Sequence, residues 1–321
     1  MRIVAEIGAA HNGSLQRALA IVEAAGAAGA TAVKLQTWGE NMAAPYVIPS
    51  GPWAGRNLQE LYAECRTPWE WHGPIFAHCK SLGFECFSTP FDKESVDFLE
   101  TLDCPRYKIA SCELVDLDLI EYAGHTLKPM ALSTGMATQK EITEALAVAG
   151  PNVTLLKCVS SYPAAAEDYN LRTMKRMAED FGCFVGISDH SKGTAAAVVA
   201  TVMGATMIER HLSLDNEGPD GGFASNPSEF KAMVDAVRQA EKIVGEVRYG
   251  PLPSEIDTLA LRRSLYVVKD IEPGEALDSE NMGTRRPALG MAPNRLPWLI
   301  GRKLPRGATA GTPITPDLLD A

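Results

Sequence analysis

The chain is poor in the features that mark several broad classes of protein. Only seven of its 321 residues are cysteines, and these are scattered, odd in number and without a CxxC pair. Such cysteines fit reduced thiols in a cytoplasm better than a disulfide framework or a structural zinc site. The start, "MRIVAEIG", lacks the basic and apolar regions of a signal peptide. We therefore expect a cytoplasmic protein.

Two further absences narrow the choice of partner. No run of eighteen apolar residues is present, so the sequence predicts no transmembrane helix. Positive charge is also scarce, since 30 Lys and Arg stand against 40 Asp and Glu, a net charge of −10. We therefore expect neither nucleic acid nor an anionic membrane as a partner. A small anionic ligand stays open, because the charge inside a pocket decides its binding.

What the chain does have is an alternation of strand-like and helix-like segments. Short, mostly apolar, β-rich runs recur at residues 2–7, 31–36, 84–87, 107–109, 129–132, 153–158, 183–187 and 206–208. Alanine-rich amphipathic stretches lie between them, among them residues 15–28, 93–102, 139–148, 194–203 and 227–244. Apolar strands joined by helices are typical of parallel sheets covered on both faces. The pattern favours an α/β fold, a (β/α)8 TIM barrel, over an open doubly wound sheet.

The texture of the sequence changes after residue 245. The stretch "GEVRYGPLPSE", residues 245–255, contains glycines and prolines and has no helical or strand period. After it, "RRSLYVVKDIEPGEAL" predicts a strand followed by a Glu-Pro-Gly turn. We therefore assign residues 1–245 to the barrel, 246–261 to a linker and 262–321 to a small second domain.

Polar residues gather where the eight predicted strands end. A TIM barrel carries its catalytic groups at this end of its strands. In strand order, the ends supply Glu6; Lys34; Thr89; Lys108, Ser111 and Glu113; Ser133; Ser160 and Tyr162; Ser188 and His190; and Glu209 and His211. We interpret this set as the mouth of an active site.

Lys34 and Lys108 interrupt strands that are otherwise apolar. Each could extend its amine to the barrel rim, or serve as a Schiff-base lysine whose pKa burial lowers. We favour an anion site, because hydroxyl groups at the same level would add donors for a phosphate. The hydroxyls concerned are those of Thr89, Ser111, Ser133 and Ser188.

His190 and His211 follow neighbouring strands, so their rings can converge on one metal ion. A lone histidine is more often a core or surface residue, but a matched pair favours a ligand role. Two imidazoles with water and substrate oxygens suit Mn²⁺ or Mg²⁺ acting as a Lewis acid, with zinc or cobalt as alternatives.

Glu6 and Glu113 are the acid–base candidates, and a structural salt bridge is the alternative for each. Asp189 and Glu209, one and two residues before their histidines, are candidates for a contact with the metal-binding rings or with the substrate. Cys112 is interpreted as a small buried hydrophobe.

Several motifs, taken together and in order, resemble the sialic (nonulosonic) acid synthases. They are "AEIGAAHNG", "VKLQT", "FSTPFD", "YKIASCE", "LSTGM", "LLKCVSSYP", "ISDHS", "IERH" and "GPDGGF". That family condenses phosphoenolpyruvate with an N-acetylated hexosamine and releases phosphate. The tail from residue 262 is similar to the family's antifreeze-like (SAF) domain.

Within the family, "GPWAGRNLQELYAECRTPWEWH" and "KIASCELVDLDLIE" resemble the pseudaminic acid synthase branch. Cys112 and Ser160 stand where neuraminate synthases usually carry glycine and often carry asparagine, which points the same way. The stretch "GPDGGF" departs from the Gly-Pro-Asp-Ser-Ala-Phe of that branch. Neuraminate and legionaminic acid synthase activities therefore stay as alternatives.

The resemblance also implies a role for each matching residue. Phosphoenolpyruvate would be held by Lys34, Thr89, Lys108, Ser111, Ser133 and Ser188. His190 and His211 would hold the divalent metal, with Mn²⁺ the first choice and Mg²⁺ or Co²⁺ as alternatives. The sugar would be contacted, or protons moved, by Glu6, Glu113, Tyr162, Glu209 and Asp220, with Ser160 beside them.

Arg286, in "TRRPALG", matches the arginine that the family's small domain inserts into a partner's barrel. The resemblance therefore implies a domain-swapped homodimer. Two readings from other classes stay open. One is a barrel aldolase with Lys108 or Lys157 as its Schiff base, and the other is a carbohydrate-binding protein without catalysis.

Overall fold

The computed structural model describes residues 1–40, 42–215 and 217–320. The chain divides into two compact units, Met1–Gly245 and Glu246–Ala321. The first unit holds the polar strand ends.

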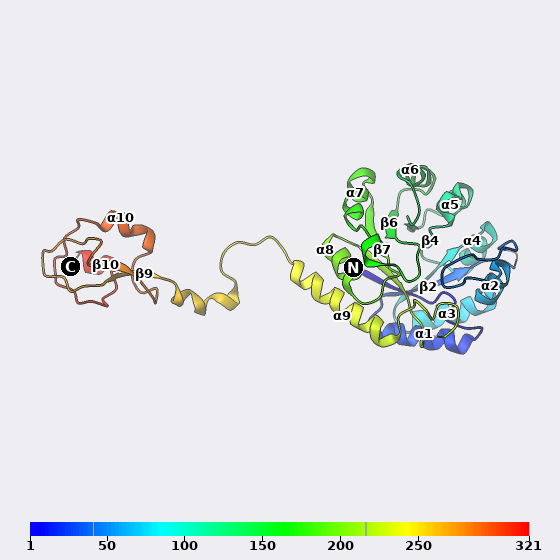
Figure 1. Cartoon of the computed structure of the whole chain (residues 1–321), viewed down its shortest axis with the longest axis horizontal. Coiled ribbons are helices and arrows are strands. Elements are labelled where there is room, and N and C mark those ends of the chain that lie inside the picture. The colour runs from blue at the N-terminus through cyan, green and yellow to red at the C-terminus, as the bar shows by residue number, and fades with distance from the viewer. Residues whose placement is uncertain (41, 216, 321) are drawn as a thin grey trace. The chain divides into compact units, whose positions relative to one another are not determined.

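The first unit is a closed barrel of eight parallel strands in sequence order, with β8 paired to β1 (Figure 1). The strands are β1 (Arg2–Glu6), β2 (Ala32–Thr37), β3 (Glu85–Pro90), β4 (Tyr107–Ile109), β5 (Met130–Ser133), β6 (Val153–Cys158), β7 (Phe184–Ser188) and β8 (Met207–His211). The predicted (β/α)8 TIM barrel is confirmed. The ends of two strands were predicted least well: β3 continues to Pro90 and β8 to His211, each three residues past its predicted end.

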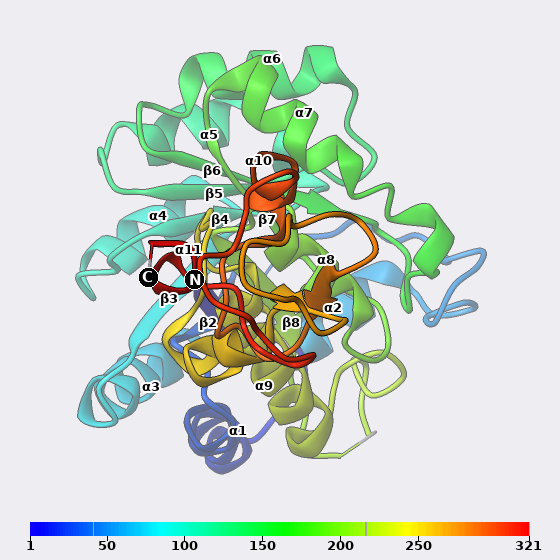
Figure 2. The same ribbon diagram turned by 90° about the vertical axis from the view of Figure 1, so that its left-hand side faces the viewer.

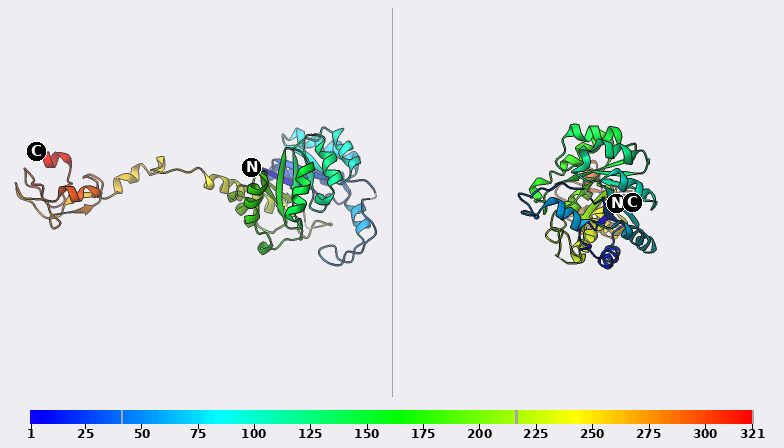
Figure 3. Two further views of the ribbon diagram at one scale, coloured as in Figure 1. Left: turned by 90° about the horizontal axis from the view of Figure 1, so that it is seen from above. Right: turned by 90° about the vertical axis from the view of Figure 1, so that its right-hand side faces the viewer.

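Helices surround the strands, as Figure 2 and the right-hand view of Figure 3 show. They are α1 (Leu15–Ala28), α2 (Leu58–Cys65), α3 (Trp69–Ser81), α4 (Lys93–Glu100), α5 (Leu117–Gly124), α6 (Gln139–Val148), α7 (Arg172–Phe181), α8 (Ala195–Val202) and α9 (Pro227–Val244). Capping side chains set where these helices begin, since they accept backbone N–H groups that have no partner within the helix. Ser14 caps α1, and Thr138 forms a capping box with Glu141 at α6.

Apolar side chains from strands and helices form one continuous core in the barrel unit. The largest fully buried members include Phe87, Tyr107, Phe230, Leu35 and Ile109. Successive residues of a strand point to opposite faces, so only every second residue can reach the interior of the barrel. The core thus fixes which polar residues face the mouth.

The second unit is small and has a core of its own, which includes Leu265, Val267, Leu277, Leu304 and Ile314. Its regular elements are β9 (Ser264–Val267), β10 (Met282–Arg285), α10 (Leu296–Leu299) and α11 (Pro316–Asp320), with β9 and β10 antiparallel. The predicted turn is present, and the Glu275 N–H donates to the Glu272 carbonyl at 3.0 Å. The predicted linker carries two short 3-10 helices, Pro253–Glu255 and Asp257–Leu261. None of the helices in the described residues is long and apolar enough to span a membrane.

Candidate active site

A small polar cavity of about 50 Å³ lies at the carboxyl ends of the barrel strands. We call it the inner cavity. The structure brings eleven of the predicted site residues to its lining: Glu6, Lys34, Thr89, Lys108, Ser111, Ser133, Tyr162, Ser188, His190, Glu209 and His211. They come from strands far apart in the sequence, because closing the barrel places all the strand ends on one rim.

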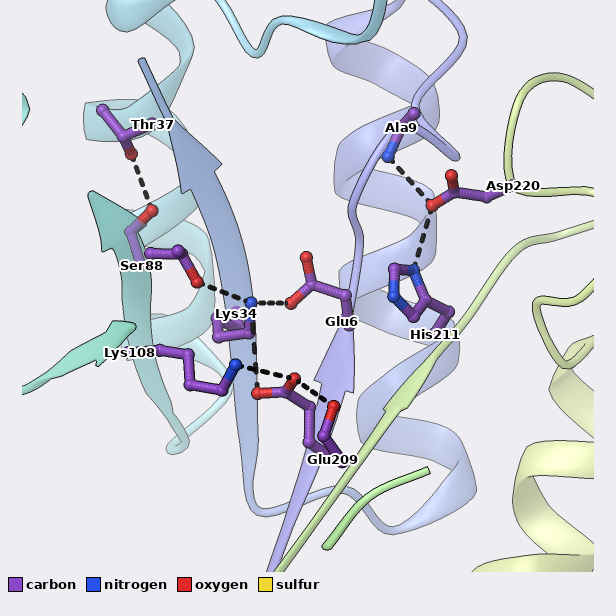
Figure 4. A network of polar contacts seen from close by, with 11 residues as sticks. Glu6, Ala9, Lys34, Thr37, Ser88, Lys108, Glu209, His211 and Asp220 are labelled. Carbon is purple, nitrogen blue, oxygen red and sulfur yellow. Dashed lines mark hydrogen bonds and ion pairs between the residues drawn. The ribbon is translucent and has the colours of Figure 1, made fainter. Parts of the chain in front are cut away.

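The two lysines point into this cavity and are joined by a carboxylate (Figure 4). Lys34 Nζ donates to Thr89 Oγ1 at 2.8 Å and pairs with the Glu6 carboxylate. Glu209 lies between the lysines, 3.9 Å from Lys34 Nζ and 3.6 Å from Lys108 Nζ. Glu209 also accepts a hydrogen bond from Ser188 Oγ at 3.1 Å. Both lysines are therefore inside the barrel, as the sequence predicted, and both face carboxylates.

Burial and charge act in opposite directions on these groups. Burial by itself would raise the pKa of Glu209, but the ammonium groups of Lys108 and Lys34 lower it to about 2. Burial raises the pKa of Glu6 although Lys34 opposes this. Burial would lower the pKa of Lys34, but Glu209 and Glu6 together raise it. Lys34 and Glu209 are therefore charged at neutral pH.

The rings of His190 and His211 lie on one side of the inner cavity, with centroids 5.6 Å apart. His190 Nδ1 donates to the Val159 carbonyl at 2.9 Å, and His211 Nδ1 donates to Asp220 Oδ2 at 3.0 Å. In the described part of the chain, no hydrogen bond uses the Nε2 atom of either ring. A histidine that donates one N–H to an oxygen and keeps its other nitrogen free is the usual form of a metal ligand.

The histidine pair would supply two protein ligands to a divalent ion. Across residues 1–40, 42–215 and 217–320, no group of three or more His, Cys, Asp or Glu side chains could hold a metal by itself. An ion at the pair would therefore complete its coordination with water and substrate oxygens. This fits an ion that is open to substrate rather than a closed structural site.

Gly8 allows Asp220 to approach His211. Asp220 Oδ2 also accepts the Ala9 N–H at 3.0 Å. A Cβ atom at Gly8 would lie 2.4 Å from Asp220 Oδ2 and 3.0 Å from His211 Nδ1, and Gly8 has a φ of +49°. A side chain at this position would therefore strain the backbone and push the pair apart.

A second, larger cavity of about 240 Å³ adjoins the first, and Gln36, Ser111, Tyr162 and His211 line both. We call it the outer cavity. Glu113, Ser160 and Asp220 lie on this outer wall. Burial raises the pKa of Glu113. Among the described residues, one oxygen of Glu113 and the Ser160 hydroxyl have no hydrogen-bond partner, so both are available to a ligand.

Cys112 and Asp189 differ from the predictions made for them. Cys112 was expected to be buried, but its side chain is exposed and lines the outer cavity. It follows the short β4, where the chain has already left the barrel wall. Asp189 was a candidate for a contact with the substrate or with a metal-binding histidine ring. It pairs instead with Arg210 and accepts the hydroxyl groups of Tyr169 and Ser191, at 2.6 Å and 2.7 Å.

Lys157 and Arg286 lie elsewhere. The Nζ of Lys157 donates to the Cys158 carbonyl at 3.1 Å, and Lys157 is not among the described residues that line either cavity. This weakens the aldolase reading for Lys157. Arg286 is exposed in the second unit. Its predicted role in a partner's barrel stays a prediction.

The cavity-lining residues that sequence reasoning missed include Cys158 in the inner cavity, and Trp53 and Phe223 in the outer one. Cys158 ends β6 in register with Ser188, which could have placed it at the mouth. Trp53 lies in the Gly- and Pro-rich "SGPWAGR", where an aromatic residue between strand and helix is itself a signal. Phe223 belongs to "GPDGGF", in which only Asp220 was assigned a role.

Comparisons with known proteins agree with this fold and site. Residues 21–249 match the NeuB family and residues 262–320 match the SAF domain. The chain is 40% identical to the pseudaminic acid synthase of Helicobacter pylori, covering 98% of this chain and 97% of the relative. It is 32% identical to the N,N'-diacetyllegionaminic acid synthase of Legionella pneumophila, covering 99% and 94%.

A solved structure, the N-acetylneuraminic acid synthetase of Leptospira borgpetersenii in complex with citrate, superposes with a TM-score of 0.70 at 29% identity. That match covers 80% of this chain and 89% of the other. The family match spans most of the barrel unit and includes all strands from β2 to β8. The chain therefore belongs to the NeuB family and carries a SAF domain at residues 262–320.

Proposed function

We propose that this protein is a pseudaminic acid synthase. It would condense phosphoenolpyruvate with a di-N-acetylated, 6-deoxy hexosamine to give a nine-carbon nonulosonic acid and free phosphate. The observation that carries the proposal is the inner cavity, where Lys34 and Lys108 lie beside the paired rings of His190 and His211. The choice of branch is supported by 40% identity to a pseudaminic acid synthase, against 32% to a legionaminic one.

Phosphoenolpyruvate would occupy the inner cavity. Lys34 and Lys108 supply positive charge for its phosphate and carboxylate, and hydrogen bonds from charged groups are stronger than neutral ones. The further donors are the hydroxyl groups of Thr89, Ser111, Ser133 and Ser188. The Ser133 hydroxyl has no hydrogen-bond partner within the described residues, so an anion could use it without breaking an existing bond.

The sugar would extend from the histidines into the outer cavity. A divalent ion on His190 and His211, with Mn²⁺ preferred over Mg²⁺ or Co²⁺, would polarise the aldehyde oxygen of the open-chain sugar. Tyr162 lines both cavities, so it would lie between the two substrates along this path. Ser160, Asp220 and Glu209 then offer polar contacts to the sugar on its way outward.

The chemistry joins two carbons and releases phosphate. C3 of phosphoenolpyruvate forms a bond to the aldehyde carbon, whose oxygen takes up a proton. Water adds to C2 and gives up one proton. The hydroxyl group so formed then loses its proton to become the C2 ketone as the C2–O bond to phosphate breaks, and phosphate leaves with the bridging oxygen and takes up that proton. Burial raises the pKa of both Glu113 and Glu6, which suits carboxyl groups that exchange protons. We assign Glu113 to the water and Glu6 to the sugar side.

We further propose a domain-swapped homodimer. Arg286 lies exposed on the second unit, so it is free to contact a ligand in another chain. From a partner, its guanidinium would hold the N-acyl group of the sugar and close the outer cavity. A planar group with five donors suits such a polar contact.

The test is an acceptor panel with phosphoenolpyruvate and Mn²⁺. The acceptors are N-acetylmannosamine and the 2,4-diacetamido-2,4,6-trideoxy forms of mannose and altrose. Phosphate release and product mass are measured, with chelator-treated enzyme as the control. We expect turnover of the altrose form and its loss with chelator. Turnover of another acceptor alone would contradict the branch, and an adduct of Lys108 trapped by borohydride, with chelator-insensitive activity, would support the aldolase.

A further inference from the structure

Residues 47–57, between β2 and α2, fold back on themselves beside the mouth of the barrel. Val47 and Asn57 form an antiparallel bridge, and the Ile48 N–H donates to the Arg56 carbonyl at 3.0 Å. The glycines at the tip have positive φ angles, which turn the chain there. The left-hand view of Figure 3 shows this segment, in blue ahead of α2, projecting from the helices. We call it the β2–α2 hairpin.

Trp53 is at the tip of the hairpin and turns back toward the barrel. Its neighbours Pro52 and Ala54 are exposed, whereas Trp53 is half-buried and lines the outer cavity. Its indole Nε1 donates to the Pro219 carbonyl at 2.9 Å, in the loop that follows β8. This bond joins two loops that are 166 residues apart in the sequence. Trp53 therefore holds the hairpin against the loop that follows β8.

Trp53 meets two other rings to form what we call the aromatic corner, composed of Trp53, Tyr162 and Phe223. Its ring centroid lies 5.4 Å from that of Tyr162 and 5.7 Å from that of Phe223. Tyr162 and Phe223 are 4.8 Å apart. Ring pairs at these separations stabilise one another and make a fixed apolar surface.

The corner has a defined place along the path of the sugar. Tyr162 lies 4.3 Å from the ring of His190, and Phe223 lies 5.0 Å from that of His211. Trp53 comes after both, one ring farther from the histidines. A sugar with its aldehyde at the histidines would pass Tyr162 and Phe223 and bring its far end, C5 and C6, to Trp53.

We propose that Trp53 is a specificity-determining residue that selects a 6-deoxy acceptor over a 6-hydroxy one. The inference deepens the proposed function and rests on it. The one polar atom of the indole is already bonded to Pro219, so its face presents only apolar surface. A methyl group at C6 would pack against this face and be removed from water. A hydroxyl group at C6 would lose its hydrogen bonds to water without gaining a hydrogen-bond partner on the protein. An apolar wall of this kind discriminates against an added hydroxyl by about 100-fold at most.

The test compares two acceptors that differ only at C6, namely the 2,4-diacetamido altrose derivative with a methyl or with a hydroxymethyl group. Dissociation constants and kcat/KM are measured for wild type, Trp53→Ala and Trp53→Phe, with Mn²⁺ present. We expect wild type to prefer the 6-deoxy acceptor by about 10- to 100-fold. Trp53→Ala should lower the preference to about threefold or less, and Trp53→Phe should keep part of it because a ring remains. The KM for phosphoenolpyruvate should not change.

Trp69→Phe is the matched control, because Trp69 Nε1 also donates to a carbonyl, that of Trp38, at 3.1 Å within the α3 packing. It should leave the preference unchanged. Equal losses for both acceptors in Trp53→Ala, with an unchanged ratio, would overturn the proposal. A binding preference that depends on Trp53 without phosphate release would overturn the proposed function and leave the specificity role intact. Failure of wild type to bind either acceptor would overturn both.

Discussion

In β7 and β8, adjacent residues have different tasks because their side chains point to opposite faces. Ser188, Glu209 and His211 reach the inner cavity. Arg210, between the last two, pairs with Asp189 and donates to the Gly193 carbonyl ahead of α8. Residues 209–211 thus supply two side chains to the cavity and one, Arg210, that supports the strand from outside the cavity.

The first prediction concerns the charge of the inner cavity. Lys34→Met should lower kcat/KM for phosphoenolpyruvate by about 100-fold or more, since loss of one partner of a buried charged contact costs about 2–5 kcal/mol. The loss in kcat/KM should exceed that from the missing lysine–anion contact alone. The reason is that the carboxylates of Glu6 and Glu209 would face the anion without the Lys34 ammonium group. Steady-state kinetics with varied phosphoenolpyruvate measures this, with circular dichroism to verify folding.

Lys157→Met is the matched control for that variant. Lys157 is also a strand lysine, but its amine donates to the Cys158 carbonyl, and Lys157 is not among the described residues that line either cavity. The kcat/KM of Lys157→Met should stay within about threefold of the wild-type value, because Lys157 makes no contact that stabilises the transition state. Equal losses in both variants would contradict an anion site at Lys34.

The second prediction tests whether the hydrogen bond to Asp220 holds His211 in place for metal binding. Gly8→Ala would place a Cβ 2.4 Å from Asp220 Oδ2, so it should separate Asp220 from His211 and weaken Mn²⁺ binding about 10- to 100-fold. Gly13→Ala has a similar backbone cost at φ +69°, but its Cβ would meet none of the described atoms within 4 Å. It should lower the melting temperature and leave the Mn²⁺ affinity unchanged. Titration calorimetry that finds equal affinities in the two variants would refute this role of Gly8.

At the scale of elements, a buried network braces the end of β7. The Tyr169 hydroxyl donates to Asp189 Oδ1 at 2.6 Å and accepts the His190 backbone N–H at 2.8 Å. Asp189 also pairs with Arg210 of β8. The network thereby ties the segment ahead of α7 to β8 and to the residues after β7 that include His190. Most polar atoms of the network are paired, although the Arg210 Nε has no hydrogen-bond partner among the described residues. Buried hydrogen bonds of this kind restrict the geometry of the segments that they join.

The third prediction follows from this network. Tyr169→Phe removes both hydrogen bonds, so the His190 backbone should shift and Mn²⁺ affinity should fall about 10-fold. Tyr122→Phe is the control, since the Tyr122 hydroxyl donates to Asp97 at 2.7 Å on the protein surface. Calorimetric affinities and melting curves of both variants are compared. If Tyr169→Phe loses only stability, the network is structural and does not position His190.

At the scale of the whole molecule, the fourth prediction tests the swapped dimer. Arg286→Ala and Lys108→Met should each be nearly inactive as homodimers. A heterodimer purified with two different tags should regain about half the wild-type activity, because one of its two sites would combine an intact barrel with an intact arginine. An inactive heterodimer, or a fully active Arg286→Ala protein, would contradict the swap.

The sequence predicted which residues reach the cavity better than it predicted how those residues pair with one another. A lysine near the end of an apolar strand has few places to point, so Lys34 and Lys108 could be placed inside the barrel. Their pairing with Glu6 and Glu209 could not, because it depends on the register between strands, such as Glu6 opposite Lys34. Trp53 escaped notice because its hairpin has no helical or strand period, and its place is set by one bond to a distant loop.

The most direct test of the central claim uses phosphoenolpyruvate labelled with ¹⁸O at the oxygen that bridges C2 and phosphorus. The enzyme is supplied with Mn²⁺ and the 6-deoxy altrose acceptor, and phosphate is observed by phosphorus NMR. The released phosphate should carry the label, because the C2–O bond breaks. Label retained in the sugar acid, or acceptor-dependent turnover without phosphate release, would contradict it.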